Sequence, residues 1–330
     1  MTLKQTICIA GASGLVGANL TKAALERGYR VNGTLRDSND TDKTQYLFAL
    51  PGAAERLQLY SADMGNPGAF DEALTGADAV FIACLIPTYF GLEGKPARHM
   101  EDEQGHNEIV MLTVDGCLNI LKSASAQGIK NALICSSTSS TNPKQPVAKK
   151  NEIDHWSDQA HQYAQKKYTS AAKTVMERAA IEFAEQRKIR LSIFLPTLML
   201  GPAILPDHAR QGFQGMLKKM IEGGASRHQE IPNDSTSMIN VQDLASLFFA
   251  AYENEDAHGR YFGMFESWHY RDIYAELAKL IPEAEMPEPL LETALPATGF
   301  DFTRRDSLGV SLSSIPTILR QTVASLRGDS

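Results

Sequence analysis

The chain has 330 residues, of which 43% are hydrophobic and 22% charged, so it can bury a core and is not a disordered or low-complexity chain. Its formal net charge is −7 and its lysines and arginines form no long run, which argues against a nucleic-acid binder. The most apolar window, 191–205, is interrupted by Pro196 and Gly201, so no membrane partner is expected.

The first 140 residues alternate between strand-like and helix-like patterns. Helices that separate strands in this way are typical of a parallel sheet covered on both faces. The pattern therefore predicts an α/β protein with a doubly wound, Rossmann-type sheet. Its strands are expected at 6–10, 30–35, 57–62, 79–84 and 132–135, and its helices at 15–27, 67–74 and 108–127.

The second half begins with a helix predicted at 170–186 and a strand at 191–195, after which the pattern loosens. We expect a larger domain, which contains this sheet, over 1–198, to which 241–265 returns. A smaller, mostly C-terminal substrate region is expected over 199–240 and 266–330. The further predicted elements are helices at 212–221, 241–252 and 270–280 and a strand at 259–264.

The four cysteines are Cys8, Cys84, Cys117 and Cys135, and each lies within an apolar run without a CxxC spacing or a nearby histidine ligand. This usage is typical of buried thiols in a reducing compartment. We therefore expect a cytoplasmic protein with no metal site. No signal peptide is expected either, because apolar periodicity starts at Thr6 and leaves no room for a charged leader.

The turn between the first strand and the first helix carries a GxxGxxG spacing. Glycines at such a turn allow close approach to a pyrophosphate and close packing of the helix on the strand, and the helix N-terminus then faces the anion. In this strand–turn–helix context the motif predicts a dinucleotide site. The residues assigned to it are Gly11, Ser13, Gly14, Leu15, Val16 and Gly17.

The end of the second predicted strand decides between NAD and NADP. An acidic residue there binds the ribose 2′-hydroxyl of NAD, whereas an arginine accommodates the 2′-phosphate of NADP. Arg36 matches the terminal position and Asp37 follows it. NADP(H) is therefore predicted, with Lys43 as a second positive charge, and NAD bound through Asp37 is the alternative.

Two further pairs of residues follow the third strand and end the fourth. Asp63, followed by Met64, is placed either to hydrogen-bond the adenine amino group or to cap a turn. Ala83 and Cys84 are small, which lets a cofactor lie against the backbone. All four residues are assigned to the cofactor site.

Together these motifs resemble the extended short-chain dehydrogenase/reductase family, in particular its dihydroflavonol-reductase and cinnamoyl-CoA-reductase type. The resemblance implies hydride transfer between NADPH and a small-molecule carbonyl, with a serine, a tyrosine and a lysine at the reacting centre. The NWYCYGK signature of the CoA reductases is absent, which argues against an acyl-CoA substrate. The resemblance spans 6–326 and rests on 11–37, 107–108, 114–116, 129–137, 173–183, 196–202, 241–245 and 259–261.

The same resemblance assigns Ser137 to the carbonyl oxygen, with Ser136 and Thr138 as the alternatives. It assigns Lys173 to the tyrosine and the nicotinamide ribose. Pro196 and Thr197 are assigned to nicotinamide contact. The family's tyrosine stands four residues before the lysine, a position that Thr169 occupies here.

We expect Tyr168, five residues before Lys173, to be the proton donor, brought into line by a one-residue π-bulge. Two alternatives remain. In one, the proton donor and its lysine are the literal YxxxK pair, Tyr163 and Lys167. In the other, no tyrosine acts as the proton donor.

The sequence thus predicts an NADPH-dependent reductase of an aldehyde or ketone. An NAD-using nucleotide-sugar epimerase or dehydratase and a non-catalytic NADP-sensing protein are the alternatives, and a homodimer is left open. The long segment 85–104 is expected to border the substrate entrance. Phe213, Met216 and Trp268 are candidate apolar walls, although each is more typical of a core residue.

Overall fold

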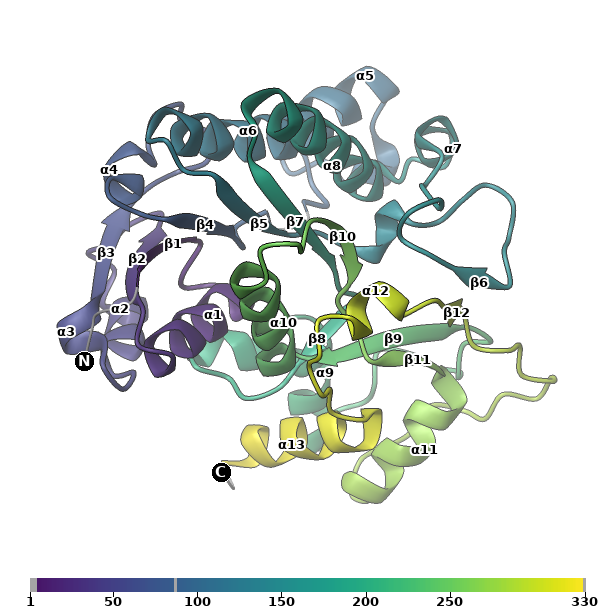
Figure 1. The fold of residues 1–330 in the computed structure, drawn as a ribbon. Coiled ribbons are helices and arrows are strands. Elements are labelled where there is room, and N and C mark those ends of the chain that lie inside the picture. The colour runs from purple at the N-terminus through teal and green to yellow at the C-terminus, as the bar shows by residue number, and fades with distance from the viewer. Residues whose placement is uncertain (1–4, 86–87, 329–330) are drawn as a thin grey trace.

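The computed structural model describes residues 5–85 and 88–328, and its centre is one seven-stranded parallel sheet (Figure 1). The strand order is β10-β7-β5-β4-β1-β2-β3. The order reverses between β1 and β4, and ligands bind beside such a switch point at the carboxyl ends of the strands. The predicted Rossmann-type sheet is confirmed. Its strands are β1 (Thr6–Ala10), β2 (Arg30–Leu35), β3 (Leu57–Ser61), β4 (Ala79–Ile82), β5 (Asn131–Cys135), β7 (Arg190–Leu195) and β10 (Gly259–Phe262).

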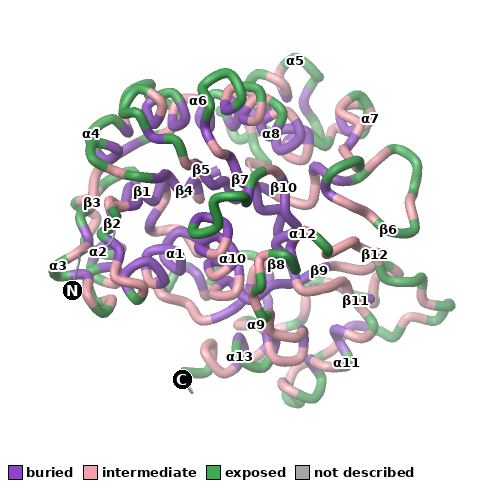
Figure 2. The backbone as a smooth tube through the Cα atoms, viewed as in Figure 1, coloured by how far each residue is buried: buried purple, intermediate pink, exposed green. Residues whose placement is uncertain are grey.

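Helices cover both faces of this sheet. On one face α1 (Leu15–Glu26) packs against α10 (Val241–Glu253), and on the other α6 (Met111–Ala126) packs against α8 (Tyr168–Arg187) (Figure 1). The central strands are therefore buried on both sides, as Figure 2 shows for β4, β5 and β7. This explains their continuous apolar runs, because neither face of the strands meets water.

Helix α6 continues an unbroken helical stretch from Asp102. The stretch begins with α5 (Asp102–Gly105) and then makes a π-helical turn, η2 (His106–Val110). Within the described residues, Asp102–Ala126 alone is long and apolar enough to cross a membrane by length and composition, and 56% of its most apolar window is buried. It packs against α8 as part of the core on this face of the sheet.

The smaller part of the molecule is built on a three-stranded sheet of order β11-β9-β8. Phe213 and Met216 are buried in the core beneath its helices, and Trp268 packs against that core, so these candidate walls are core residues. The elements are β8 (Leu198–Leu200), β9 (Ser235–Asn240), β11 (Glu266–His269), α9 (Gly212–Ile221), α11 (Tyr270–Leu280) and α13 (Ile315–Arg327).

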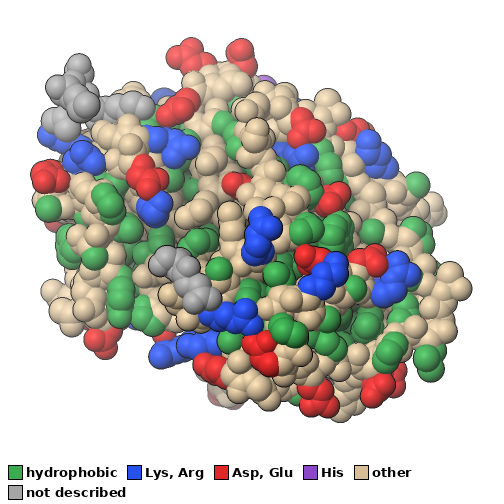
Figure 3. Space-filling model, turned by 90° about the horizontal axis from the view of Figure 1, so that it is seen from below, with side chains coloured by type: hydrophobic (Ala, Val, Ile, Leu, Met, Phe, Trp, Pro, Cys, Tyr) green, Lys and Arg blue, Asp and Glu red, His purple; other side chains and the backbone are tan. Residues whose placement is uncertain are grey.

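Short elements make the remaining connections. On the face that Figure 3 shows, basic and acidic side chains of the described residues are interspersed. The short elements are α2 (Thr41–Phe48), α3 (Ala53–Arg56), α4 (Asp71–Leu74), η1 (Ala97–His99), η3 (Thr138–Ser140), β6 (Lys149–Lys150), α7 (Gln159–Ala164), η4 (Pro206–Arg210), β12 (Gly299–Phe300) and α12 (Thr303–Asp306).

A buried ion pair ties distant segments together beside the sheet. Arg260 Nε on β10 donates to Glu177 Oε2 on α8 at 2.8 Å, and the two side chains are 5% and 0% exposed. The same guanidinium donates to Ser140 Oγ at 2.9 Å and to the Glu152 carbonyl at 2.8 Å. Since neither charge can reach water, each depends on the other for its stabilisation.

We expect Glu177→Ala to lower the free energy of unfolding by about 3–5 kcal/mol, because it leaves the Arg260 charge buried without its partner. Urea denaturation followed by circular dichroism measures the loss. Glu185→Ala, on an exposed position of the same helix, is the matched control and should change stability by less than about 0.5 kcal/mol. Equal losses in the two variants would contradict this role of the pair.

Candidate active site

The glycine-rich turn joins β1 to α1 in a shape that only glycine permits at two positions. Gly11 has φ +88°, and a Cβ there would lie 2.8 Å from the Cβ of Cys84. A Cβ on Gly17 would collide with the Gly11 carbonyl. The turn is held on β2 by bonds from the Gly11 and Ala12 amides to the Thr34 carbonyl, at 3.1 and 2.8 Å. The free amides at the start of α1 are thereby presented to an anion.

A cavity of about 410 Å³ opens over this turn, at the switch point of the sheet. Most of the predicted cofactor residues line it, whereas Val16, Gly17, Lys173, Pro196 and Thr197 are not in its wall. The predicted residues in the wall are Gly11, Ser13, Gly14, Leu15, Arg36, Lys43, Asp63, Met64, Ala83 and Cys84. The wall also contains residues that the sequence did not assign to it, namely Thr34, Leu35, Ala62, Phe70, Thr88, Leu205, Asp207, His208 and Gln211.

Arg36 and Asp37 have different orientations at the end of β2. Arg36 lines the cavity. The Asp37 carboxylate instead accepts a bond from the Asn39 amide at 2.9 Å and so caps its own turn. Lys43 also lines the cavity and pairs with Asp40 at 2.5 Å, which lowers the pKa of that carboxyl. This end of the cavity therefore presents positive charge, which suits a phosphate group.

Asp63 caps a turn and also lies in the cavity wall. Its Oδ1 accepts a bond from the Gly65 amide at 2.8 Å, so it caps the turn after β3. It also lines the cavity, next to Met64. Met64 packs on Gly116 of α6, where an added Cβ would lie 2.9 Å from the Met64 sulfur.

His208 closes the cavity from the smaller part of the molecule. Its Nδ1 accepts from the Leu205 amide at 3.3 Å, so the imidazole proton lies on Nε2 and is donated to the Ser13 carbonyl at 3.0 Å. Burial lowers the pKa of His208 and favours this neutral form. The bond ties η4 to the glycine-rich turn. The sequence did not predict a role for His208, because no local pattern distinguishes this histidine from the others.

The candidate serine lies just beyond β5. Ser137 Oγ accepts a bond from the Ser139 amide at 3.2 Å and begins η3. The next residue, Thr138, bonds through its amide to the Pro196 carbonyl at 3.1 Å and through its hydroxyl to Thr197 Oγ1 at 2.8 Å. The structure therefore brings the Ser137 turn together with the predicted nicotinamide-contact segment.

Lys173 is buried on α8 and points toward the carboxyl end of β4. Its Nζ donates to the Leu85 carbonyl at 2.5 Å. Burial lowers the pKa of this ammonium, and the neighbouring thiol of Cys135 and carboxylate of Glu177 act in the opposite direction. A cation held here lies close to Cys84, whose backbone borders the cofactor cavity.

The structure does not bring Tyr168 to Lys173. Helix α8 is a regular α-helix from Tyr168 to Arg187, so the expected π-bulge in its first turn is wrong. In the described residues the π turn lies instead at His106–Val110. Five residues of regular helix place the two side chains about 140° apart around the axis.

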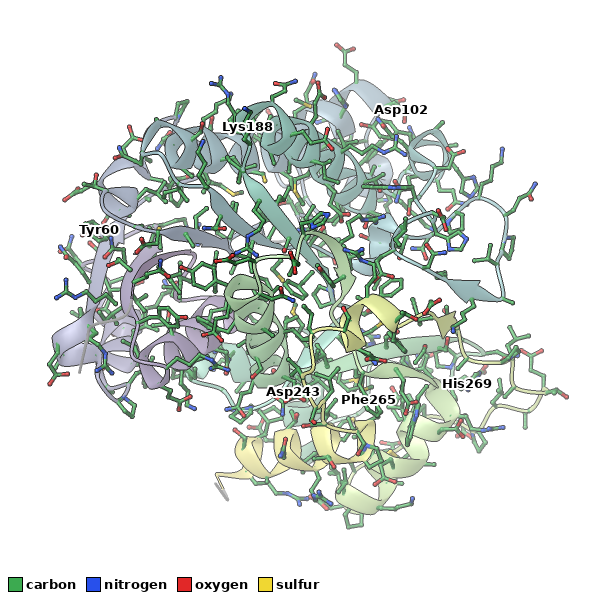
Figure 4. All side chains as sticks on the ribbon, viewed as in Figure 1. Tyr60, Asp102, Lys188, Asp243, Phe265 and His269 are labelled. Carbon is green, nitrogen blue, oxygen red and sulfur yellow. The ribbon has the colours of Figure 1, made fainter. Side chains whose placement is uncertain are left out.

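The Tyr168 hydroxyl donates to Asp102 Oδ1 at 2.5 Å. Asp102 is the first residue of α5 and lies at the upper edge of the molecule in Figure 4. Burial and the Asp102 bond raise the pKa of Tyr168, the opposite of what a proton donor needs. The role of Tyr168 as the acid stays a prediction that this geometry does not support.

The alternative pair, Tyr163 and Lys167, is not placed on one helical turn either. Tyr163 belongs to α7 and Lys167 is the residue before α8, so the two do not lie on one helical turn. Tyr163 Oη shares a hydrogen bond with His106 Nδ1 at 2.7 Å. Thr169 is the residue one turn before Lys173, and its hydroxyl donates to the Thr88 carbonyl. Within the described residues neither candidate tyrosine–lysine pair is brought onto one helical turn, and all three readings stay predictions.

The predicted substrate entrance is described except for residues 86 and 87, which lie outside the described residues. Thr88 lines the cavity. Beyond it Tyr89, Phe90 and Leu92 are exposed by 62%, 57% and 77%. The Gly91 amide donates to the Lys95 carbonyl at 2.9 Å, which turns this apolar segment back on itself.

Comparison with known proteins gives a consistent result. Residues 7–263 match the model of the NAD dependent epimerase/dehydratase family. A cinnamoyl-CoA reductase, CAD2 of Medicago truncatula, is 29% identical over 98% of this chain and 96% of its own length. A dihydroflavonol 4-reductase of Callistephus chinensis is 30% identical over 92% of this chain and 81% of its own. The resemblance inferred from the motifs is confirmed.

Solved structures show the same fold. Vestitone reductase from alfalfa (Medicago sativa) superposes with a TM-score of 0.77 at 23% identity, covering 99% of each chain. Gre2 of Candida albicans, solved with NADPH, superposes with a TM-score of 0.81 at 20% identity, covering 98% of this chain and 99% of its own.

To test the cofactor assignment, we expect Arg36→Ala to weaken NADPH binding by about 1.5–3 kcal/mol, the value of one charge-assisted bond. NADH has no 2′-phosphate, so its affinity should change little. Fluorescence titration of both cofactors measures the difference, and Asp37→Ala is the matched control. Equal loss of both cofactors in Arg36→Ala would refute the assignment.

His208→Ala should weaken NADPH binding by about 0.5–1.5 kcal/mol, because one hydrogen bond that holds η4 over the cavity is lost. The same titration measures it. His258→Ala, at an exposed histidine, controls for the loss of an imidazole elsewhere. An unchanged affinity would show that η4 does not contribute to cofactor retention.

Proposed function

Because the chain belongs to the NAD dependent epimerase/dehydratase family, we propose that it is an NADP(H)-dependent reductase of an aldehyde or ketone. The curated relatives that it matches over most of its length are reductases, which supports this reaction over NAD-dependent epimerisation. One observation carries the choice of NADP(H). Arg36 borders the cavity, while the Asp37 carboxylate is turned into its own loop.

The residues present fit this cofactor. The amides at the start of α1 would face the pyrophosphate, and Arg36 with Lys43 would hold the 2′-phosphate. When bound, NADPH supplies the hydride. Lys173 would hold the nicotinamide ribose and supply positive charge there. Ser137 would donate a hydrogen bond to the carbonyl oxygen as negative charge develops on it.

Location and assembly are also part of the proposal. Four free cysteines, of which Cys84 is half-buried and the others buried, suit a reducing cytoplasm. A homodimer is the proposed assembly, and Leu112, 44% exposed on α6, offers an apolar contact for it. Light scattering on the purified protein measures the assembly.

We expect Ser137→Ala to lower kcat about 100-fold while NADPH affinity stays nearly constant, because an oxyanion contact acts mainly in the transition state. Steady-state kinetics with a carbonyl substrate, together with fluorescence titration of NADPH, measures both quantities. Ser139→Ala, two residues along the same turn, is the matched control. Full activity of Ser137→Ala would move the role to another hydroxyl.

The proposed function itself is tested by the consumption of NADPH with a panel of aldehydes and ketones. A product reduced by two electrons, identified by mass spectrometry, is the expected result. Tight NADPH binding without any reduced product across the panel would instead favour a non-catalytic NADP-sensing protein.

A further inference from the structure

The position that faces the reacting centre from α8 carries an aliphatic hydroxyl. Thr169 lies one helical turn before Lys173, so the two share a face of α8. Its hydroxyl donates to the Thr88 carbonyl, at the edge of the cofactor cavity. The side chain therefore anchors the segment after β4.

The tyrosines nearest to this position are engaged elsewhere. The Tyr168 hydroxyl is bonded to Asp102 and the Tyr163 hydroxyl to His106. Tyr89 stands on the exposed segment after β4, 62% accessible to solvent. The Lys173 ammonium donates to the Leu85 carbonyl.

Aliphatic hydroxyls are found on the segments that carry the predicted reacting groups. Ser137 and Thr138 follow β5, where Thr138 is bonded to Thr197, and Thr169 lies on α8 with Lys173. An aliphatic hydroxyl is a far weaker acid than a phenol, so it can donate a hydrogen bond to an anion but transfers its proton poorly. The reduction of an unconjugated ketone needs this proton transfer to the oxygen. Without it, hydride addition would leave an alkoxide whose negative charge is localised and strongly basic. The site thus stabilises negative charge better than it protonates it.

We propose that the substrate is an α,β-unsaturated carbonyl compound, in which the negative charge formed by hydride transfer is delocalised. This rests on the proposed NADP(H)-dependent reductase function, but it moves hydride addition from the carbonyl carbon to the β-carbon of a conjugated ketone or aldehyde. The hydride forms a C–H bond at the β-carbon, and the electron pair of the C=C bond moves toward the oxygen. Ser137 and Lys173 stabilise the resulting enolate. The proton that completes the product comes from water and ends on the α-carbon, so one NADPH and one proton are consumed.

The entrance matches such a substrate. Thr88, which Thr169 anchors, is followed directly by the exposed side chains of Tyr89 and Phe90, with Leu92 close behind. Aromatic and aliphatic side chains beside the cofactor cavity favour a flat, conjugated body over a small hydrophilic one.

The test compares two probes that differ only in conjugation, benzylideneacetone and its saturated counterpart benzylacetone. The wild-type protein should convert benzylideneacetone to benzylacetone with NADPH. It should reduce benzylacetone to the alcohol at least about 100-fold more slowly, since positioned general acids contribute a factor of that order. In heavy water, deuterium should appear at the α-carbon of the product.

Two variants sharpen the comparison. Thr169→Tyr restores a phenol one turn before Lys173 and should raise the reduction of benzylacetone at least about 10-fold. Thr169→Ser keeps an aliphatic hydroxyl and should leave the preference for the conjugated probe in place. Circular dichroism verifies that both variants are folded. If Thr169→Tyr does not fold, the rates of the wild-type protein with the two probes test the proposal by themselves.

The proposal is overturned if wild-type protein reduces benzylacetone as fast as benzylideneacetone. Loss of that ketone reduction in Tyr168→Phe would then identify Tyr168 as the acid, and loss in Lys173→Arg would identify the lysine. Reduction of the benzylideneacetone carbonyl to the allylic alcohol also overturns it. These outcomes leave the proposed reductase function intact, whereas that function fails only if no aldehyde, ketone or enone is reduced.

Discussion

The contact on which the site depends is the buried pair of Glu177 and Arg260. Glu177 lies one turn beyond Lys173 on α8, and its second oxygen accepts a bond from Ser136, the neighbour of Ser137. Arg260 adds bonds to Ser140 and lies 3.6 Å from the centre of the Trp156 ring. One carboxylate and one guanidinium thus set where the serine turn and the lysine lie relative to each other, although they come from different elements.

Cofactor binding and proton chemistry are carried by separate parts of the structure. The wall of the cofactor cavity comes from the β1–α1 turn, the ends of β2, β3 and β4, and the segment around His208. The candidate reacting groups come from the end of β5 and from α8. Because the two sets share few residues, the cofactor end can follow the family pattern while the acid position departs from it.

Local patterns were sufficient to predict the large sheet and the cofactor loop. Strands such as β1, β2 and β5 are short apolar runs, and the glycine spacing follows β1 directly, so periodicity and turn chemistry identify them without tertiary information. The small sheet was not predicted, because β8, β9 and β11 are brief and gain their stability from partners distant in sequence. The helix α13, with a buried apolar face, was also missed.

The candidate site was predictable only in part. Counting residues before Lys173 identified Thr169 as an irregularity, but counting cannot show where each side chain points. The bond from Tyr168 to Asp102 spans 66 positions and that from Arg260 to Glu177 spans 83. Such pairings have no sequence signature. The candidate serine could be located because it follows β5 closely, and the candidate lysine because it lies within the recognisable sequence of α8.

The path of the chain between its two sheets limits how this architecture can diversify. The chain leaves the large sheet after β7 for β8 and β9, returns through α10 and β10, and leaves again for β11 (Figure 1). Neither part is therefore a continuous stretch that a single recombination event could exchange for another. New specificities must arise by point substitution and by changes of loop length within one inherited framework, with the cofactor-binding half retained throughout.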